Sequence, residues 1–156
     1  MNTMKYFITV LSCFICIQLF ACSNKDEKMT SSLNNILNTD SMKLRITIGT
    51  NAFTATLYKN ESAAAFEEKL PMTINMKELN GNEKYFDLPA DLPANASNPG
   101  IIQAGDLMLY GSNTLVLFYK TFSTSYNYTK LARIDDPSKL AAALGSGNVT
   151  VKFEME

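Results

Sequence analysis

The sequence contains no histidine and no tryptophan among its 156 residues. The absence of histidine removes the usual general base near neutral pH, the Ser-His and Cys-His catalytic pairs, and the commonest zinc ligand. An enzyme built from this chain would have to work with carboxylates, Lys, Arg, Tyr or side-chain amides alone. We expect no metal site and no cofactor.

Cysteine is also scarce, because Cys13, Cys16 and Cys22 are the only three and all lie near the start of the chain. The remainder has no thiol, which excludes disulfides, thiolate nucleophiles and Cys metal sites there. Neither sign of charge is in excess, since 14 basic and 15 acidic residues give a formal net charge of −1. Without a cluster of Lys and Arg, the sequence predicts no nucleic-acid partner.

Residues 1–21 have the pattern of a signal peptide. Lys5 supplies the positive start, an uncharged apolar run follows, and Leu19-Phe-Ala-Cys22 closes the segment. This ending resembles the bacterial lipobox, in which the cysteine is lipidated and becomes the mature N-terminus. We therefore expect a lipid anchor on Cys22. It would place the protein in the bacterial cell envelope, at the outer membrane, facing either the periplasm or the outside.

A retained transmembrane helix is the alternative for this apolar segment. The run is about 15 residues long, shorter than the roughly 20 that a membrane-spanning helix needs. Residues 22–41 are polar after the cysteine, which predicts a flexible tether between the lipid and a folded domain. The folded domain is expected over residues 42–156, as a monomer whose length suits a single core.

Residues 42–156 carry mainly the two-residue alternation of β-strands. One hairpin is predicted around Gly49-Thr-Asn51 and another around Asn80-Gly81, a strong hairpin-turn pair. Further strands are predicted at residues 106–110, 114–119, 128–134 and 149–154. Two short segments have helical spacing instead. They are residues 62–70, with Asn60 or Ser62 as N-cap, and residues 137–144, with Asp136 as N-cap.

These elements indicate a mainly β protein. Seven or eight strands and two short helices in one core favour a closed antiparallel β-barrel of about eight strands with two short capping helices. A two-layer α+β sheet, with both helices gathered on one face, is the alternative. The strand and helix patterns alone do not distinguish the two.

One segment resembles a known family. Ile101-Ile-Gln-Ala-Gly-Asp106 is similar to the Met-Ile-Gln-Gly-Gly-Asp stretch of the cyclophilin peptidyl-prolyl isomerases. The hairpin ending in Leu57-Tyr58, the helix after it and the closing Val149-Thr-Val-Lys-Phe153 strand resemble the first and last elements of that fold, in the same order. The chain thus resembles bacterial cyclophilin-like proteins, which implies a cyclophilin-like barrel over most of residues 42–155.

The resemblance does not extend to the residues that isomerise proline peptides. A guanidinium that donates to the proline nitrogen eases rotation about the X-Pro bond, but Asn95 stands where cyclophilins have that Arg. Gly100-Ile101 replaces the Phe-Met pair of the proline pocket. Only Gln103 remains, so we expect no catalytic residues and a non-catalytic binding module. An isomerase with a site rebuilt around Arg45 or Arg133 is the alternative.

Aromatic residues crowd the segment that follows this motif. We expect a ligand groove lined by Gln103 and by polar and aromatic side chains after it, namely Tyr110, Asn113, Tyr119, Phe122, Tyr126 and Tyr128. Core packing is the alternative for some of these rings, since strand alternation must bury part of them. The expected partners are the membrane, through the lipid, and a peptide or small-molecule ligand.

Overall fold

The structure is a computed structural model that describes residues 42–156. The predicted signal peptide, Cys22 and the tether lie outside these residues, so lipidation and membrane anchoring stay predictions. Neither helix within residues 42–156 combines the length and the apolar character that crossing a bilayer requires.

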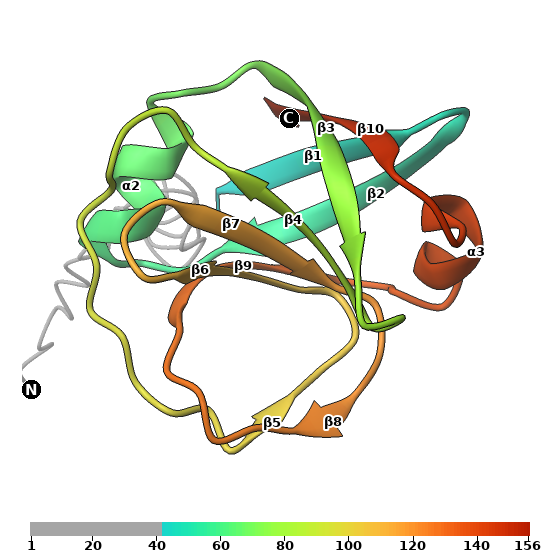
Figure 1. Cartoon of the computed structure of the whole chain (residues 1–156). Helices are drawn as coiled ribbons and strands as arrows, with labels where there is room; N and C mark the ends of the chain where they lie inside the picture. Colours follow the sequence, from blue (N-terminus) through green and yellow to red (C-terminus); the bar gives the residue numbers. More distant parts are fainter. Residues whose placement is uncertain (1–41) are drawn as a thin grey trace, which may run out of the picture. The chain divides into compact units, whose positions relative to one another are not determined.

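Eight strands close into an antiparallel barrel, in the order β1-β10-β3-β4-β7-β6-β9-β2 (Figure 1). The strands are β1 (Lys43–Ile48), β2 (Asn51–Leu57), β3 (Met72–Leu79), β4 (Glu83–Asp87), β6 (Asp106–Tyr110), β7 (Thr114–Phe118), β9 (Thr129–Ile134) and β10 (Val149–Met155). The predicted closed antiparallel barrel of about eight strands is confirmed. The two-layer alternative is wrong, because the first and second strands complete the ring through β10 and β9.

Both predicted hairpins form at the turns that the sequence indicates. β1 and β2 pair across Gly49-Thr50, and β3 joins β4 through Asn80-Gly81, whose φ angles are 55° and 70°. The N–H of Asn82 donates to the carbonyl of Leu79 at 3.3 Å. Positive φ at both central residues is the geometry of a type I′ turn, whose twist matches that of the strands it joins.

The apolar residues of the barrel wall divide between two clusters because strand residues alternate between faces. On β7, Leu115 and Leu117 belong to the core inside the barrel, whereas Val116 and Phe118 belong to a second apolar cluster with Met108. Both faces of β7 are therefore covered. This explains why its sequence is an uninterrupted apolar run rather than an alternating one.

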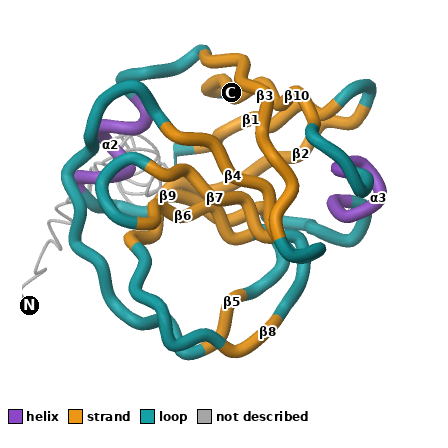
Figure 2. Tube along the Cα trace, in the orientation of Figure 1, coloured by secondary structure: helices purple, strands orange, loops and turns teal. Residues whose placement is uncertain are grey.

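The strand pattern does not predict a small sheet that accompanies the second cluster. In it, β5 (Ile101–Ile102) pairs with β8 (Phe122–Ser123) in antiparallel register, and loops connect both strands to the barrel (Figure 2). Two-residue strands are too short to reveal a two-residue period. The ring of Phe122 lies 5.8 Å from that of Phe118, centroid to centroid, so this segment packs against the outer side of the barrel wall.

The first predicted helix is present as α2 (Glu61–Glu67). Asn60 is its N-cap, since its side-chain oxygen accepts a backbone N–H of the first turn at 2.8 Å. Ser62 is buried within the helix instead. Phe66 is also buried and meets Phe153 of β10 edge-on, with 6.0 Å between the ring centroids. The helix is thereby joined to the core.

The second helix is shorter than predicted. α3 spans Leu140–Leu144 rather than residues 137–144, and no side chain caps it. The Oδ1 atom of Asp136 accepts the N–H of Ser138 at 3.0 Å, and the residues before the helix form a turn. The prediction of Asp136 as helix N-cap is therefore wrong, because its carboxylate closes this turn two residues on.

Candidate functional site

A groove of about 540 Å³ lies against the outer face of β4 and β7. Its lining comes from the turn between β3 and β4, from outward-facing residues of β4 and β7, from the end of β6, and from the segment between β8 and β9. The lining residues are Leu79, Asn80, Asn82, Glu83, Tyr85, Asp87, Tyr110, Thr114, Val116, Phe122, Ser123, Thr124, Ser125, Tyr126 and Tyr128. A hollow of this size is typical of small-molecule sites.

One wall of the groove comes from β4, because its residues alternate between the two sides of the barrel wall. Glu83, Tyr85 and Asp87 face the groove, whereas Lys84 is fully buried. β7 lies beside β4, with Val116 opposite Tyr85. The pairing of β4 with β7 therefore brings residues that are distant in the sequence to one surface.

Three tyrosines form the aromatic side of the groove. The ring centroids of Tyr110 and Tyr126 are 6.1 Å apart with their planes at 90°, and those of Tyr110 and Tyr128 are 5.6 Å apart at 50°. Tyr110 is 47% exposed and Tyr126 61%, whereas Tyr128 is buried. Burial, together with the nearby Glu83 carboxylate, raises the pKa of Tyr128 to about 12. Its hydroxyl therefore stays protonated at neutral pH.

The polar groups of the groove are rich in hydrogen-bond acceptors. Glu83 and Asp87 are both carboxylates, and the described residues that line the groove include no Lys or Arg. Thr114 Oγ1 donates to Asp87 Oδ1 at 2.8 Å, while the buried Oδ1 of Asn82 has no hydrogen-bond partner within residues 42–156. Burial and the nearby Glu78 carboxylate raise the pKa of Glu83. The groove thus combines aromatic rings with negative charge.

The barrel is similar in sequence and in structure to known proteins. The sequence model of the family described as the cyclophilin-like family matches residues 46–154. The chain belongs to the cyclophilin-like family. A solution structure of a hypothetical protein from Archaeoglobus fulgidus is similar, with a TM-score of 0.51 and 17% sequence identity over 74% of this chain and 95% of that one. This likeness supports the shared fold alone. A search of curated proteins gives no match.

Gln103, which this cyclophilin-like chain shares with the isomerases, is not among the residues that line the groove. It lies in the turn before β6, where its N–H donates to Asp106 Oδ2 at 2.8 Å and its carbonyl accepts the N–H of Asp106 at 3.1 Å. Burial raises the pKa of Asp106, although Arg133 Nη1 lies 3.5 Å from its Oδ1. The motif therefore anchors a loop of the cyclophilin-like barrel.

Neither arginine that a rebuilt isomerase site would use lines the groove. Arg133 lies beside Asp106, and Arg45 Nε lies 3.7 Å from Glu156 Oε1. Asn95, at the position of the isomerase Arg, is exposed. No three His, Cys, Asp or Glu side chains within residues 42–156 are grouped so that they could hold a metal ion.

The structure brings together some of the residues expected to line a groove and separates others. Those that line it are Tyr110, Phe122, Tyr126 and Tyr128. Besides Gln103, two lie elsewhere: Asn113 Nδ2 donates to the carbonyl of Leu88 at 3.4 Å, and the Tyr119 hydroxyl donates to Glu78 Oε1 at 2.8 Å. The wall from β4 is absent from the sequence prediction. The alternation within β4 groups its three outward residues, but only the barrel order places them beside the tyrosines.

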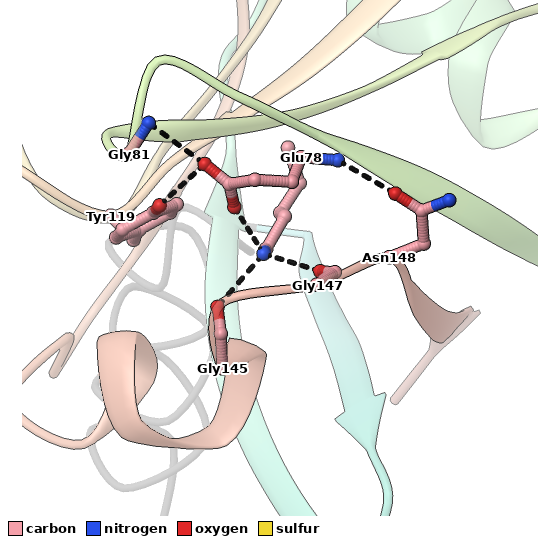
Figure 3. A network of polar contacts seen from close by, with 7 residues as sticks. Glu78, Gly81, Tyr119, Gly145, Gly147 and Asn148 are labelled. Carbon is pink, nitrogen blue, oxygen red and sulfur yellow. Dashed lines mark hydrogen bonds and ion pairs between the residues drawn. The ribbon is translucent and has the colours of Figure 1, made fainter.

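A buried polar network lies on the other face of β4 (Figure 3). Lys84 is 0% exposed, forms an ion pair with Glu78, and donates to the carbonyl oxygens of Gly145 at 2.8 Å and Gly147 at 2.6 Å. The ammonium nitrogen also lies 5.4 Å from the centroid of the Tyr119 ring. The network joins β3 and β4 to the end of β7 and to the loop after α3.

Glu78 is the hub of this network. Burial acts to raise its pKa, but hydrogen bonds from Lys84, Tyr119 and the N–H of Gly81 outweigh burial and hold the pKa below its ordinary value. None of these four residues lines the groove. Their contacts tie the β3–β4 turn to its neighbours, which is a structural task.

Proposed function

We propose that this cyclophilin-like chain is a lipid-anchored module that binds a peptide or small-molecule ligand without catalysing a reaction, at the outer membrane of a bacterial cell envelope. The aromatic groove carries the proposal. Three of the large apolar side chains that residues 42–156 leave exposed, Leu79, Tyr110 and Tyr126, line it. Exposed apolar side chains gathered at a hollow are typical of binding sites.

The character of the groove favours binding over isomerisation. Among the described residues that line the groove there is no Arg whose guanidinium could donate to a proline nitrogen. Losing one such preorganised donor typically costs about 3 kcal/mol of transition-state stabilisation. The groove tyrosines can donate a hydroxyl proton, but a neutral phenol is a weaker donor than a charged group.

The absence of catalysis is tested with a proline-peptide isomerisation assay on the detergent-solubilised mature protein. We expect wild type and Gln103→Ala to leave the uncatalysed rate unchanged. Turnover well above background that Gln103→Ala abolishes would contradict the non-catalytic proposal.

Ligand binding is tested by titrating peptides and small molecules and following the tyrosine fluorescence of the same protein. Four of its tyrosines line the groove, and no tryptophan masks the signal. A groove ligand should lose affinity in Tyr126→Ala, because that ring is exposed and lines the hollow. A ligand that binds with unchanged affinity in this variant would not be using the groove.

Anchoring is tested separately in a bacterial host, with the full chain and a labelled fatty acid. Cys22→Ser should abolish both incorporation of the label and sedimentation with membranes. Cys16→Ser is the matched control, because it removes a thiol from the same segment without touching the lipobox. Equal labelling of the two variants would contradict lipidation at Cys22.

A further inference from the structure

The charge of the groove narrows the chemistry of its ligand, an inference that rests on the proposed function. We propose that the groove binds a small organic cation, a primary ammonium group on an apolar body. The Glu83 carboxylate would face the ammonium, the Asp87 carboxylate at the other end of β4 would add negative charge to the groove, and Tyr110, Tyr126 and Tyr128 would contact the body.

The charge of the groove is complementary to that of a cation. Neither Glu83 nor Asp87 belongs to any of the ion pairs within residues 42–156. Lys84 follows Glu83 in the chain but is held on the opposite face of β4 by Glu78. Lys77 Nζ lies 5.7 Å from the centroid of the Tyr85 ring, yet Lys77 does not line the groove. The two groove carboxylates are thus left for a cation from outside.

The groove also holds hydrogen-bond acceptors that suit an ammonium group. A primary ammonium has three N–H donors and no acceptor. The groove offers the Glu83 carboxylate and the Asp87 carboxylate, one oxygen of which accepts a hydrogen bond from Thr114. A neutral acceptor such as an ether would leave these groups unpaired, and an anion would be repelled.

The aromatic side of the groove suits the apolar body of such a ligand. Tyr110 and Tyr126 meet at 90°, so they present ring faces in two directions, and the ring of Tyr128 packs against that of Tyr110. Ring faces attract cations and also pack well against apolar groups. Val116 and Phe122 add apolar surface. The volume of about 540 Å³ suits a small molecule with one charged end.

The test compares three probes of similar shape that differ in charge: 2-phenylethylamine, 2-phenylethanol and 3-phenylpropanoate. Each is titrated into the detergent-solubilised mature protein by calorimetry. The amine should bind about tenfold more tightly than the alcohol, because ion-assisted hydrogen bonds are roughly twice as strong as neutral ones. The carboxylate should not bind measurably.

Variants separate the charge from the aromatic surface. Glu83→Gln should lower the affinity for the amine about tenfold and leave that for the alcohol unchanged, since the amide keeps the shape but not the charge. Asp91→Asn is the matched control, because Asp91 is an exposed acid outside the groove lining. Tyr126→Ala should weaken both the amine and the alcohol, by about threefold or more. Asp87→Asn serves in the same comparison if Glu83→Gln does not fold.

Two outcomes would overturn this inference. One is equal affinity for the amine and the alcohol, with no response to Glu83→Gln. The other is no detectable binding of the amine at about 10 mM, far above the range of specific ligands. If a peptide or the alcohol still bound in the groove, the proposed binding module would stand without its preference for cations. If no peptide or probe bound, both proposals would fail.

Discussion

Replacing Lys84 by Met should lower the free energy of unfolding of the barrel by about 3 kcal/mol. Lys84 is fully buried and supplies the only cation in contact with Glu78 among the described residues. The substitution keeps an unbranched apolar side chain but leaves the Glu78 carboxylate without its cationic partner. It also removes the donor from the carbonyl groups of Gly145 and Gly147.

The expected loss of unfolding free energy depends on how buried Lys84 and its partners are. Removing one member of a buried ion pair typically costs about 3–5 kcal/mol. The side chain of Glu78 is 20% exposed and keeps its hydrogen bonds to Tyr119 and Gly81. Gly145 and Gly147 are exposed, so water can replace the lost donor. These features place the cost at the lower end of that range, at about 3 kcal/mol. A loss of this size corresponds to a fall in Tm of roughly 10 °C for a domain of this length.

Urea unfolding of the protein, followed by circular dichroism, measures this cost. Lys152→Met is the matched control, because Lys152 pairs with Glu154 at 2.6 Å on an exposed surface. That pair should contribute less than about 1 kcal/mol. The double variant Lys84→Met with Glu78→Gln should lose less stability than the sum of the losses in the two single variants, because neither member of the ion pair is then left as an unpaired charge. A Lys84→Met protein within about 1 kcal/mol of wild type would refute the reasoning, because desolvation of the ammonium would then cancel its contacts.

Two further predictions concern pH and a glycine. Because the pKa of Glu78 is lower in the folded state than its ordinary value of 4.5, its contribution is present above that value and is lost as pH falls through the folded pKa. Urea unfolding between pH 7 and pH 3 should thus show a steeper loss of stability in wild type than in Glu78→Gln, and parallel profiles would contradict this. Gly105→Ala should cost about 2–3 kcal/mol, because Gly105 has φ of 91° and an added Cβ would lie 3.1 Å from Pro137 Cβ. Gly147→Ala, where an added Cβ meets nothing within 4 Å, is the control in the same unfolding measurement, and an equal loss in both variants would contradict the steric argument.

Local signals in the sequence are sufficient to predict most turns and helix starts of the barrel. The Asn80-Gly81 pair determines the β3–β4 hairpin through the two positive φ angles that it readily adopts. Asn60 determines the start of α2 because its side chain satisfies a free N–H there. Such signals act over a few residues, so they can be read without knowledge of the fold. The predicted start of α3 is wrong for the same reason, because an Asp at position 136 fits the local pattern of a helix N-cap and of a turn equally well, and it closes a turn in the structure.

The groove depends on contacts that no local pattern specifies. Tyr110, Tyr126 and Tyr128 are close in the sequence, and a cluster of aromatic residues is visible there. Glu83 and Asp87 reach the same surface only because β4 pairs with β7. Strand alternation shows that these two carboxylates share a face, but not which neighbouring strand or loop that face meets. The acidic character of the groove therefore emerges from the barrel order rather than from any motif.

The two faces of β4 make the buried network and the groove interdependent. Lys84 on one face is fixed by partners on β3 and on the loop after α3, while Glu83 and Tyr85 on the other face form a groove wall. Because alternate residues of a strand point to opposite sides, holding Lys84 in place also determines the direction of its two neighbours. A buried lysine is costly to keep in a barrel that apolar residues could fill. The contacts of Lys84 offset this cost and hold the β3–β4 hairpin in one position, and with it the groove wall on the other face of β4.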